Sequence, residues 1–381
     1  MGLKNEAQSA LQNTKTVYKE YISGMTKDRL GKEFYKDTDR LKQLYHDAIG
    51  QDVDDPRKED LPAHTKFLRL FSSLTQRLNP TRRLIFGLST LTFFGYYLFD
   101  FLGISQYIIF YDLMVPFAFG SMLMLLLVEL LEKSDVKREI DLAREIQLSL
   151  LPPTEFTGED LEIYSFANTA KEVGGDYVDM IHNDEGTYIV IADVSGKGLT
   201  AALYMVRMQA LVHLIIEKSK PTPKELFLEL NNYVKSDIKD KTFVTACAAF
   251  FPKGENNFIF ARAGHNAPIF FSNERDATFD LRSDGFALGM TTTKSLDDHL
   301  QEKKFHFKQG DSVLFYTDGL TEARNELGEE YGEDRLDAIM SVYGSLHAKT
   351  IIKKVQSSLE NFIGTEKPAD DITFTCVHRS D

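Results

Sequence analysis

The feature that most constrains this chain is a long stretch without basic side chains. No Lys or Arg occurs between residues 84 and 132, although the 381 residues include 44 of them. Two mainly apolar runs fill the stretch, LIFGLSTLTFFGYYLF and YIIFYDLMVPFAFGSMLMLLLVELL, and the short segment DFLGISQ, with Asp100, Gly103 and Gln106 as the turn, separates them. Because a helix needs about 20 apolar residues to cross a bilayer, residues 84–131 are predicted to form a transmembrane helical hairpin.

Basic residues flank this hairpin on both sides, whereas its turn has none. Arg82 and Arg83 precede the first run, and Lys133, Lys137 and Arg138 follow the second. Since basic residues concentrate on the cytoplasmic side of membranes, both termini are predicted to face the cytoplasm in a multi-pass protein. The alternative is a buried helical pair inside a soluble domain.

Two further segments are expected to be helical. Residues 1–83 have apolar side chains at helical spacing and no cluster that carries chemistry, so we expect a helical cytoplasmic region of unknown role. It is either a sensory or partner-binding module, or a packing cap or membrane-surface helix pair. Residues 132–153 predict a linker helix that ends at two prolines. Its apolar seam consists of Val136, Ile140, Ala143, Ile146 and Leu150. This spacing favours a parallel homodimer through a coiled coil, and the alternative is a single helix packed on its own domain.

Residues 154–381 have the pattern of a mixed domain. Eight segments rich in β-branched and aromatic residues predict strands: LEIYSFA, DYVDMIH, TYIVIAD, FVTACAAFF, NFIFARA, PIFF, SVLFYTD and DITFTCVH. Four helices are expected near residues 199–219, 222–239, 333–342 and 348–363. Runs of strands interrupted by pairs of helices predict an α+β fold, with sheets packed face to face and helices outside.

Acidic residues recur where these strands meet turns. The five acids are Asp176, Asp193, Asp318, Asp370 and Asp371. A single Asp beside Gly is more often a turn former, but the repetition favours a shared site at the rim of the sheets. Because Mg²⁺ and Mn²⁺ prefer oxygen ligands, the set suits these ions rather than zinc or copper.

Charge and cysteine content exclude other classes of protein. The formal net charge is −13, the wrong sign for a nucleic-acid-binding protein, so no nucleic acid partner is expected. Cys247 and Cys376 lie in separate apolar runs without metal-ligand spacing, so neither a thiolate metal site nor a disulfide framework is predicted. The VSGKG segment does not satisfy the phosphate-loop pattern.

Eight ordered motifs resemble those of a known family: EIQLSLLPP, VGGDYVD, DVSGKG, TFVTACAAFF, AGHNAP, FALGM, LFYTDGLTEARN and PADDIT. They are similar to the metal-dependent PPM (PP2C-like) serine phosphatases, in the bacterial branch of the stage II sporulation phosphatase and the stress-response phosphatases. The resemblance covers residues 140–378. It implies an αββα sandwich that binds two Mn²⁺ or Mg²⁺ ions between its sheets.

The resemblance also implies roles for individual residues. Asp176 and Asp193 match the acids that bridge the two ions, and the backbone carbonyl of Val194 lies beside them. Asp318 and Asp370 match the acids that complete the shell of one metal.

Three further positions bear on the resemblance. Asp371 falls where relatives carry Asn or Asp, so it is expected to support the site. Lys171 stands where eukaryotic relatives place a phosphate-binding Arg, so it is a candidate for the substrate phosphate, although a solvated loop lysine is the commoner case. Ser195 replaces a His that is proposed as general acid, so leaving-group protonation must come from water or another group.

The function implied is a membrane-tethered phosphatase of protein phosphoserine and phosphothreonine in a bacterial inner membrane. In the resembled branch the substrate is usually a STAS-domain anti-sigma-factor antagonist in a partner-switching pathway. The alternative is a catalytically silent receptor that uses the same fold to bind a partner. The presence of all four metal-binding acids favours the enzyme, and no base-reading motif supports a nucleotidyl transferase.

Overall fold

The computed structural model describes residues 71–72, 75–76, 78–104, 109, 111–158, 160–237, 242–366 and 368–380. The chain divides into two compact units, residues 1–133 and 134–381. Because the structure describes no residue before 71, the helices expected in residues 1–83 lie almost entirely outside the described residues.

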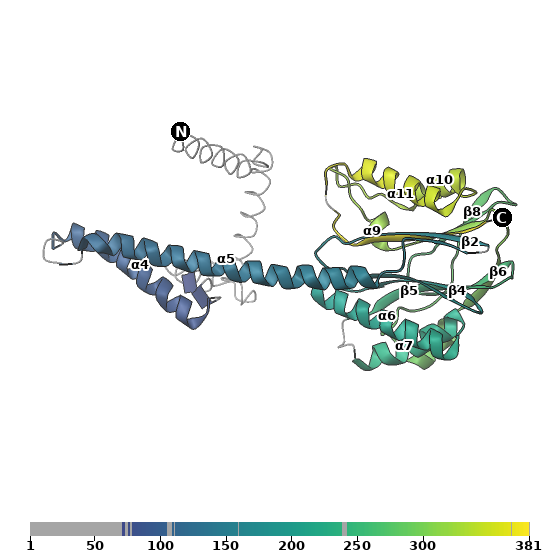
Figure 1. Cartoon of the computed structure of the whole chain (residues 1–381), viewed down its shortest axis with the longest axis horizontal. Helices are drawn as coiled ribbons and strands as arrows, with labels where there is room; N and C mark the ends of the chain where they lie inside the picture. The colour runs from purple at the N-terminus through teal and green to yellow at the C-terminus, as the bar shows by residue number, and fades with distance from the viewer. Residues whose placement is uncertain are drawn as a thin grey trace, which may run out of the picture. The chain divides into compact units, whose positions relative to one another are not determined.

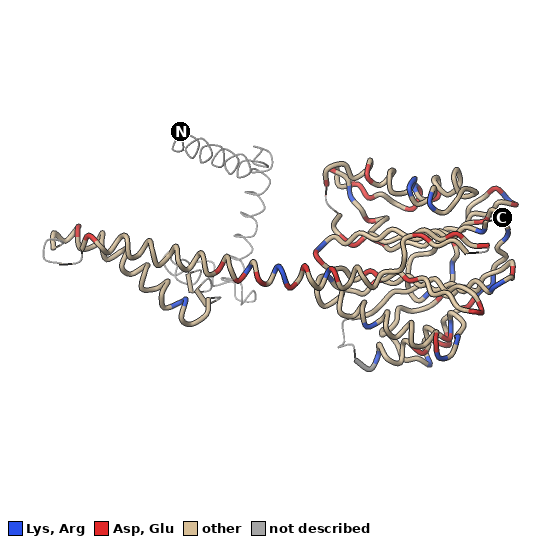
Figure 2. Tube along the Cα trace, in the orientation of Figure 1, with Lys and Arg blue, Asp and Glu red and all other residues tan. Residues whose placement is uncertain are grey.

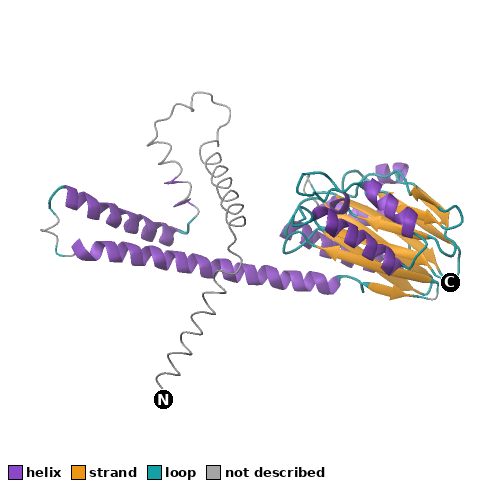
Figure 3. Ribbon diagram, turned by 90° about the horizontal axis from the view of Figure 1, so that it is seen from above, coloured by secondary structure: helices purple, strands orange, loops and turns teal. Residues whose placement is uncertain are grey.

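The first unit contains an antiparallel helical hairpin. Helix α4 (Pro80–Phe101) begins with a proline, which suits the first helical turn because that position needs no backbone donor. Helix α5 (Tyr111–Leu150) returns alongside it (Figures 1 and 3). The hydroxyls of Ser89 and Ser121 lie 2.6 Å apart across the pair, and the rings of Tyr96 and Tyr111 stack with their centroids 4.3 Å apart.

Three helices in the described part of the chain are long and apolar enough to cross a membrane: α4, α5 and α6 (Leu199–Ser219). Each helix has an apolar stretch of 18 residues. Only 6% of this stretch is buried in α4 and in α5, whereas 44% of it is buried in α6. Figure 2 shows that α4 and the first half of α5 are almost free of charged residues, in contrast to the second half of α5. Helix α6 is therefore a packed helix of the second unit, while α4 and α5 present apolar side chains outward.

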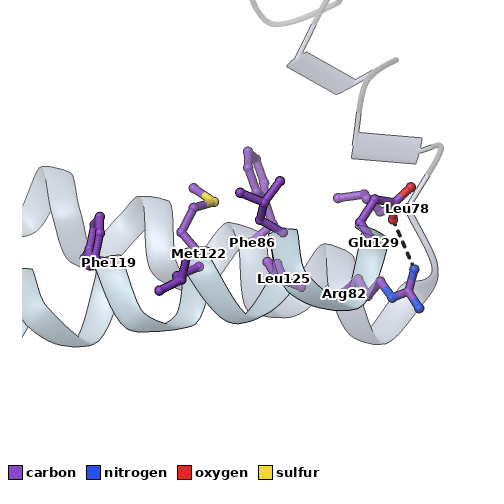
Figure 4. A pocket seen from close by; sticks show the side chains of 9 residues that line it. Leu78, Arg82, Phe86, Phe119, Met122, Leu125 and Glu129 are labelled. Atoms are coloured by element: carbon purple, nitrogen blue, oxygen red, sulfur yellow. Dashed lines mark hydrogen bonds and ion pairs between the residues drawn. The ribbon is translucent and has the colours of Figure 1, made fainter. Parts of the chain in front are cut away.

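An apolar groove of about 390 Å³ runs between α4 and α5 (Figure 4). Phe86, Phe119 and Met122 contribute to its wall. At one end Arg82 forms an ion pair with Glu129 at 3.1 Å and another with Glu132. The two acids at this end of the hairpin therefore share one basic residue on the other helix, which offsets part of their negative charge.

The second unit contains two antiparallel sheets in the described residues. One has the strands β1 (Glu155–Thr157), β2 (Leu161–Asn168), β7 (Ile269–Ser272), β8 (Ala277–Asp280), β10 (Ser312–Tyr316) and β11 (Ile372–Arg379), in the spatial order β1-β2-β11-β10-β7-β8. The other has β3 (Asp176–Asn183), β4 (Gly186–Val194), β5 (Val244–Pro252), β6 (Asn257–Ala263) and β9 (Glu302–His306), in the order β3-β4-β5-β6-β9.

Helices cover the outer face of each sheet (Figure 1). Helix α6 and helix α7 (Pro223–Asp237) pack on the five-stranded sheet, while α10 (Glu333–Tyr343) and α11 (Ala348–Ile363) pack on the six-stranded sheet. The predicted α+β fold, an αββα sandwich, is confirmed. Two short helices, α8 (Thr293–His299) and α9 (Asp318–Thr321), complete the elements described in this unit.

The core of this unit has three layers. Between the sheets, fully buried aromatic side chains such as Phe251, Phe258 and Phe315 contact aliphatic residues of the opposite sheet. Met205 and Phe227 represent the layer under α6 and α7, and other apolar residues fill the layer under α10 and α11. Burial of one such side chain contributes about 1.5–3 kcal/mol, so the packed sheets form a firm support for the loops at their rim.

Candidate active site

The first two acids are brought together by a β-hairpin. Strands β3 and β4 pair in antiparallel register, and this register places Asp176 directly opposite Asp193. The turn between the strands sets the pairing, because the side-chain oxygen of Asn183 accepts hydrogen bonds from the backbone N–H groups of Glu185 and Gly186. Opposed residues in such a ladder have Cβ atoms about 4.5–5.5 Å apart, so the two carboxyl groups share one rim of the five-stranded sheet.

The other acids lie at the ends of neighbouring strands in the six-stranded sheet. Asp318 begins α9 directly after β10, and Asp370 and Asp371 immediately precede β11. Gly319 allows these two segments to touch, because a Cβ atom at this position would lie 1.9 Å from the carbonyl oxygen of Asp371. The structure thus gathers the ends of both sheets at one place.

A buried threonine connects the two halves of the site. The hydroxyl of Thr317 donates a hydrogen bond to Asp176 at 2.7 Å and accepts one from the backbone N–H of Thr373 at 3.1 Å. Thr317 is completely buried. It therefore fixes the orientation of the Asp176 carboxyl group from the opposite sheet, a role that the sequence patterns did not suggest.

Asp371 acts differently from the other acids. One of its carboxyl oxygens accepts a hydrogen bond from the N–H of Ala170 at 2.8 Å, and the other accepts one from Gly175 at 2.7 Å. The loop approaches closely, because a Cβ atom on Gly174 would lie 2.5 Å from this carboxyl group. Asp371 thus holds the backbone of the loop that leads into Asp176.

Burial and mutual repulsion raise the pKa values of the central acids. The pKa of Asp193 is raised to about 7, first by burial and then by the charges of Asp318, Asp370 and Asp371. Burial also raises the pKa of Asp176, with a further contribution from Asp193, while its bond to Thr317 opposes the shift. The pKa of Asp318 rises for the same reasons. The cluster therefore carries more negative charge than its surroundings stabilise.

Lys197 lies at this cluster. Its ammonium group forms an ion pair with Asp370 at 2.5 Å and donates to the carbonyl oxygen of Ala369 at 3.2 Å. The bond to Asp370 raises the pKa of Lys197. The sequence patterns gave this residue no role, because VSGKG was compared only with the phosphate loop.

Gln147 was also missed, because only the apolar positions of the linker helix were considered. Its buried side-chain amide donates to the carbonyl oxygen of Gly174 at 2.7 Å and accepts from the N–H of the same residue at 3.1 Å. The end of α5 is held as well, since Gln209 on α6 donates to the carbonyl oxygen of Leu150. The last turns of α5 thus contact the glycine loop that precedes Asp176.

The remaining sequence candidates lie around this cluster. The backbone carbonyl of Val194 borders the site, 3.0 Å from where a Cβ atom of Gly175 would lie. Lys171 is exposed and forms no hydrogen bond or ion pair with the described residues. The Ser195 hydroxyl accepts a hydrogen bond from the N–H of Phe243 at 2.8 Å. His265, in the AGHNAP motif, was not assigned a catalytic role from the sequence; it is buried, and burial lowers its pKa to about 3, so its imidazole stays neutral at physiological pH.

The donor set fits a hard divalent cation. It consists of carboxylates and a backbone carbonyl, which are the ligands that Mg²⁺ and Mn²⁺ prefer. Together with burial, the negative charges of these acids raise the pKa of Asp193, and they already attract one cation, the ammonium group of Lys197. Among the described residues no three acidic, His or Cys side chains already form a complete metal site, so binding would require local adjustment of these side chains.

Comparisons with known proteins agree with this architecture. The family model described as stage II sporulation protein E (SpoIIE) matches residues 183–380. The chain is 29% identical over 227 residues to phosphoserine phosphatase RsbU of Bacillus subtilis, a match that covers 60% of this chain and 66% of RsbU. It is 26% identical over 279 residues to protein IcfG of Synechocystis, covering 65% of this chain and 43% of IcfG.

Solved structures share the fold at lower sequence identity. The SiaA-PP2C domain of Pseudomonas aeruginosa superposes with a TM-score of 0.56 at 20% identity, covering 66% of this chain and 99% of that domain. The RsbU and RsbW domains of Rv1364c from Mycobacterium tuberculosis give 0.50 at 21% identity, covering 60% and 62%. Since the family match includes more than half of the chain and the fold is that of PP2C domains, the protein belongs to the SpoIIE family of PP2C-like phosphatases.

Proposed function

We propose that this protein is a metal-dependent phosphatase that hydrolyses phosphoserine and phosphothreonine in a protein substrate. The observation that carries the proposal is the convergence of Asp176, Asp193, Asp318 and Asp370 at the rim where both sheets end. The matched part of the chain spans 66% of RsbU and 43% of IcfG. RsbU is described as a phosphoserine phosphatase, and this description supports the same reaction class here.

The acids would hold two Mn²⁺ or Mg²⁺ ions. Asp176 and Asp193 would contribute to both ions, with the carbonyl of Val194 beside them, while Asp318 and Asp370 would complete the shell of one. Bound in this way, the ions would lower the pKa of a water molecule and neutralise phosphoryl oxygens. Neither a catalytic cysteine nor a covalent phosphoenzyme is then required.

The chain's own residues position these ligands and limit proton transfer. Thr317 holds the carboxyl group of Asp176, and Asp371 holds the loop before it. The hydroxyl of Ser195 accepts a hydrogen bond from the backbone N–H of Phe243, so we assign protonation of the leaving serine oxygen to solvent. Lys171 remains the candidate for the substrate phosphate, because its neighbour Ala170 is fixed on Asp371 while its own side chain is exposed.

The apolar hairpin would tether this enzyme to a bacterial inner membrane. Outward-facing apolar residues on α4 and α5 support the tether. The basic residues on both flanks support the cytoplasmic location of both termini. The catalytic unit would then act on cytoplasmic proteins.

The substrate would be a STAS-domain anti-sigma-factor antagonist, as the family resemblance implies. The enzyme would form a parallel homodimer through the linker part of α5. Ile140 and Ala143 are partly covered, whereas Val136 and Ile146 are 54% and 53% exposed. These exposed seam residues are available to a second copy.

Hydrolysis of a phosphoserine peptide in the presence of Mn²⁺ tests the proposal. The wild-type chain should release phosphate, and Asp318→Asn should reduce turnover by at least about a hundredfold, as expected for loss of a metal-ligand charge in the site. Asp337→Asn on the exposed face of α10 is the matched control. Wild-type protein that binds Mn²⁺ but releases no phosphate would favour the alternative of a silent partner-binding receptor.

A further inference from the structure

Lys197 is held at the acid cluster by an unusual stretch of backbone. It lies between Gly196, with φ +110°, and Gly198, with φ +80°, in the loop that joins β4 to α6. Both values are ones that residues with a side chain rarely adopt. This loop directly follows Asp193 and Val194, so the chain that supplies two of the proposed ligands also delivers an ammonium group to the same rim.

The ammonium group of Lys197 pairs with one carboxylate oxygen of Asp370, and the other oxygen accepts a hydrogen bond from the N–H of Asp371 at 3.0 Å, so both oxygens already have a partner. The contact with Lys197 joins an ammonium group to a carboxylate and is a charge-assisted hydrogen bond, stronger than one between neutral groups. Among the described residues, this is the only ion pair that the five acids of the cluster form. The positive charge also opposes the rise in pKa of Asp193 and Asp318. One side chain therefore partly neutralises the whole cluster.

The ammonium group of Lys197 can move from Asp370 into solvent. The side chains of Lys197 and Asp370 are 48% and 42% exposed, and lysine has a long flexible stem. A divalent cation and an ammonium group cannot both use the same carboxylate oxygen at bonding distance, and their charges repel each other. Metal binding at Asp370 would thus require the ammonium group to move into solvent.

We propose that Lys197 is a built-in counter-cation of the metal-free site, which stabilises the gathered acids and competes with the divalent metal for Asp370. This inference rests on the proposed metal site and adds a determinant of its affinity. The lysine is a positioning residue, because it acts on the acids and not on the reacting phosphate. In this arrangement the protein accepts weaker metal binding and gains a metal-free state whose acids remain in place.

Mn²⁺ affinity of the full-length chain in detergent micelles tests the inference, with free Mn²⁺ measured by its electron paramagnetic resonance signal. Lys197→Met should bind Mn²⁺ about fivefold more tightly, as expected for removal of one half-exposed competing ion pair. Lys197→Arg keeps the charge and should stay within about twofold of wild type. Lys349→Met is the matched control, because Lys349 is 46% exposed and pairs with Glu155 at 2.6 Å on another part of the surface.

Thermal unfolding without metal gives an independent readout. Lys197→Met should lower the midpoint in EDTA and show a larger rise on addition of Mn²⁺ than wild type, whereas Lys349→Met should show the wild-type rise. Unchanged or weaker Mn²⁺ binding by Lys197→Met would overturn the inference while leaving the metal site intact. If Asp193→Asn bound Mn²⁺ as tightly as wild type does, both this inference and the proposed function would be overturned.

Discussion

Without metal, the stability of the catalytic unit should fall as the pH rises, and Asp193→Asn should remove much of this fall. The pKa of Asp193 is raised from 3.8 to about 7 by burial and by neighbouring acids. Between these two values the folded state holds a proton that the unfolded state has released. Because the folded state binds more protons, its stability decreases with rising pH across this window.

The size of the effect follows from the shift. A difference of about three pKa units corresponds to about 4 kcal/mol at 1.36 kcal/mol per unit, which is an upper bound for a fully isolated group. Asp193 is partly accessible to solvent, so screening reduces the expected contribution to about 2 kcal/mol. The amide side chain of the Asp193→Asn variant carries no charge and also relieves repulsion on Asp318. The variant should therefore gain about this amount relative to wild type at pH 8 and nothing at pH 4.

Urea unfolding of residues 134–381 in EDTA at pH 4, 6 and 8 measures this. Wild type should lose stability from pH 4 to pH 8, Asp193→Asn should lose about 2 kcal/mol less, and Asp337→Asn should follow wild type. Saturating Mn²⁺ should restore the stability of wild type at pH 8 but not raise that of Asp193→Asn. Parallel pH profiles for wild type and Asp193→Asn would refute the placement of this acid in a repulsive, buried cluster.

Three shorter predictions concern the helices. Gln147→Ala should weaken Mn²⁺ binding and lower kcat/KM several-fold, because Gly174 would lose two buried hydrogen bonds worth about 1–3 kcal/mol together. Ser149→Ala, at an exposed position of the same helix, serves as control. A kcat/KM of Gln147→Ala equal to that of wild type would contradict the coupling of α5 to the glycine loop. Ile146→Asp should reduce dimer content and turnover together in analytical ultracentrifugation and activity assays, whereas Leu148→Asp, exposed but outside the seam, should not; equal specific activity of monomer and dimer would count against control by pairing. Deletion of residues 84–131 should move the protein from the membrane to the soluble fraction, and continued pelleting with lipid would assign the anchor to residues 1–83.

All eight segments predicted as strands form strands, both the alternating segment LEIYSFA, which became β2, and segments buried on both faces. TYIVIAD and SVLFYTD became β4 and β10, which lie inside their sheets. β9 was missed because its sequence EKKFH is charged, as is typical of an edge strand that avoids pairing with other chains. β1, at another edge, has only three residues and gives too short a pattern to recognise.

The acids of the site could be found from sequence because each stands at the end of a recognisable strand. Their arrangement depends on register, which places Asp176 opposite Asp193 through a turn set by Asn183. Contacts between distant segments carry no periodic signal. Gln147 and Gly174 are 27 positions apart, and Lys197 meets Asp370 only after the two sheets have packed.

The order of strands gives Asp176 and Asp193, the two acids proposed to bridge the metal ions, unequal support. β4 lies between β3 and β5, whereas β3 ends the five-stranded sheet and pairs only with β4 among the described strands. Backbone amides of β3 that point away from β4 should therefore exchange with solvent faster than those of β4, because edge strands open locally at a lower free energy than the whole domain unfolds. A local opening of this one edge would separate Asp176 from Asp193 while the rest of the sandwich stays folded, and would give the enzyme an inactive form with an intact core.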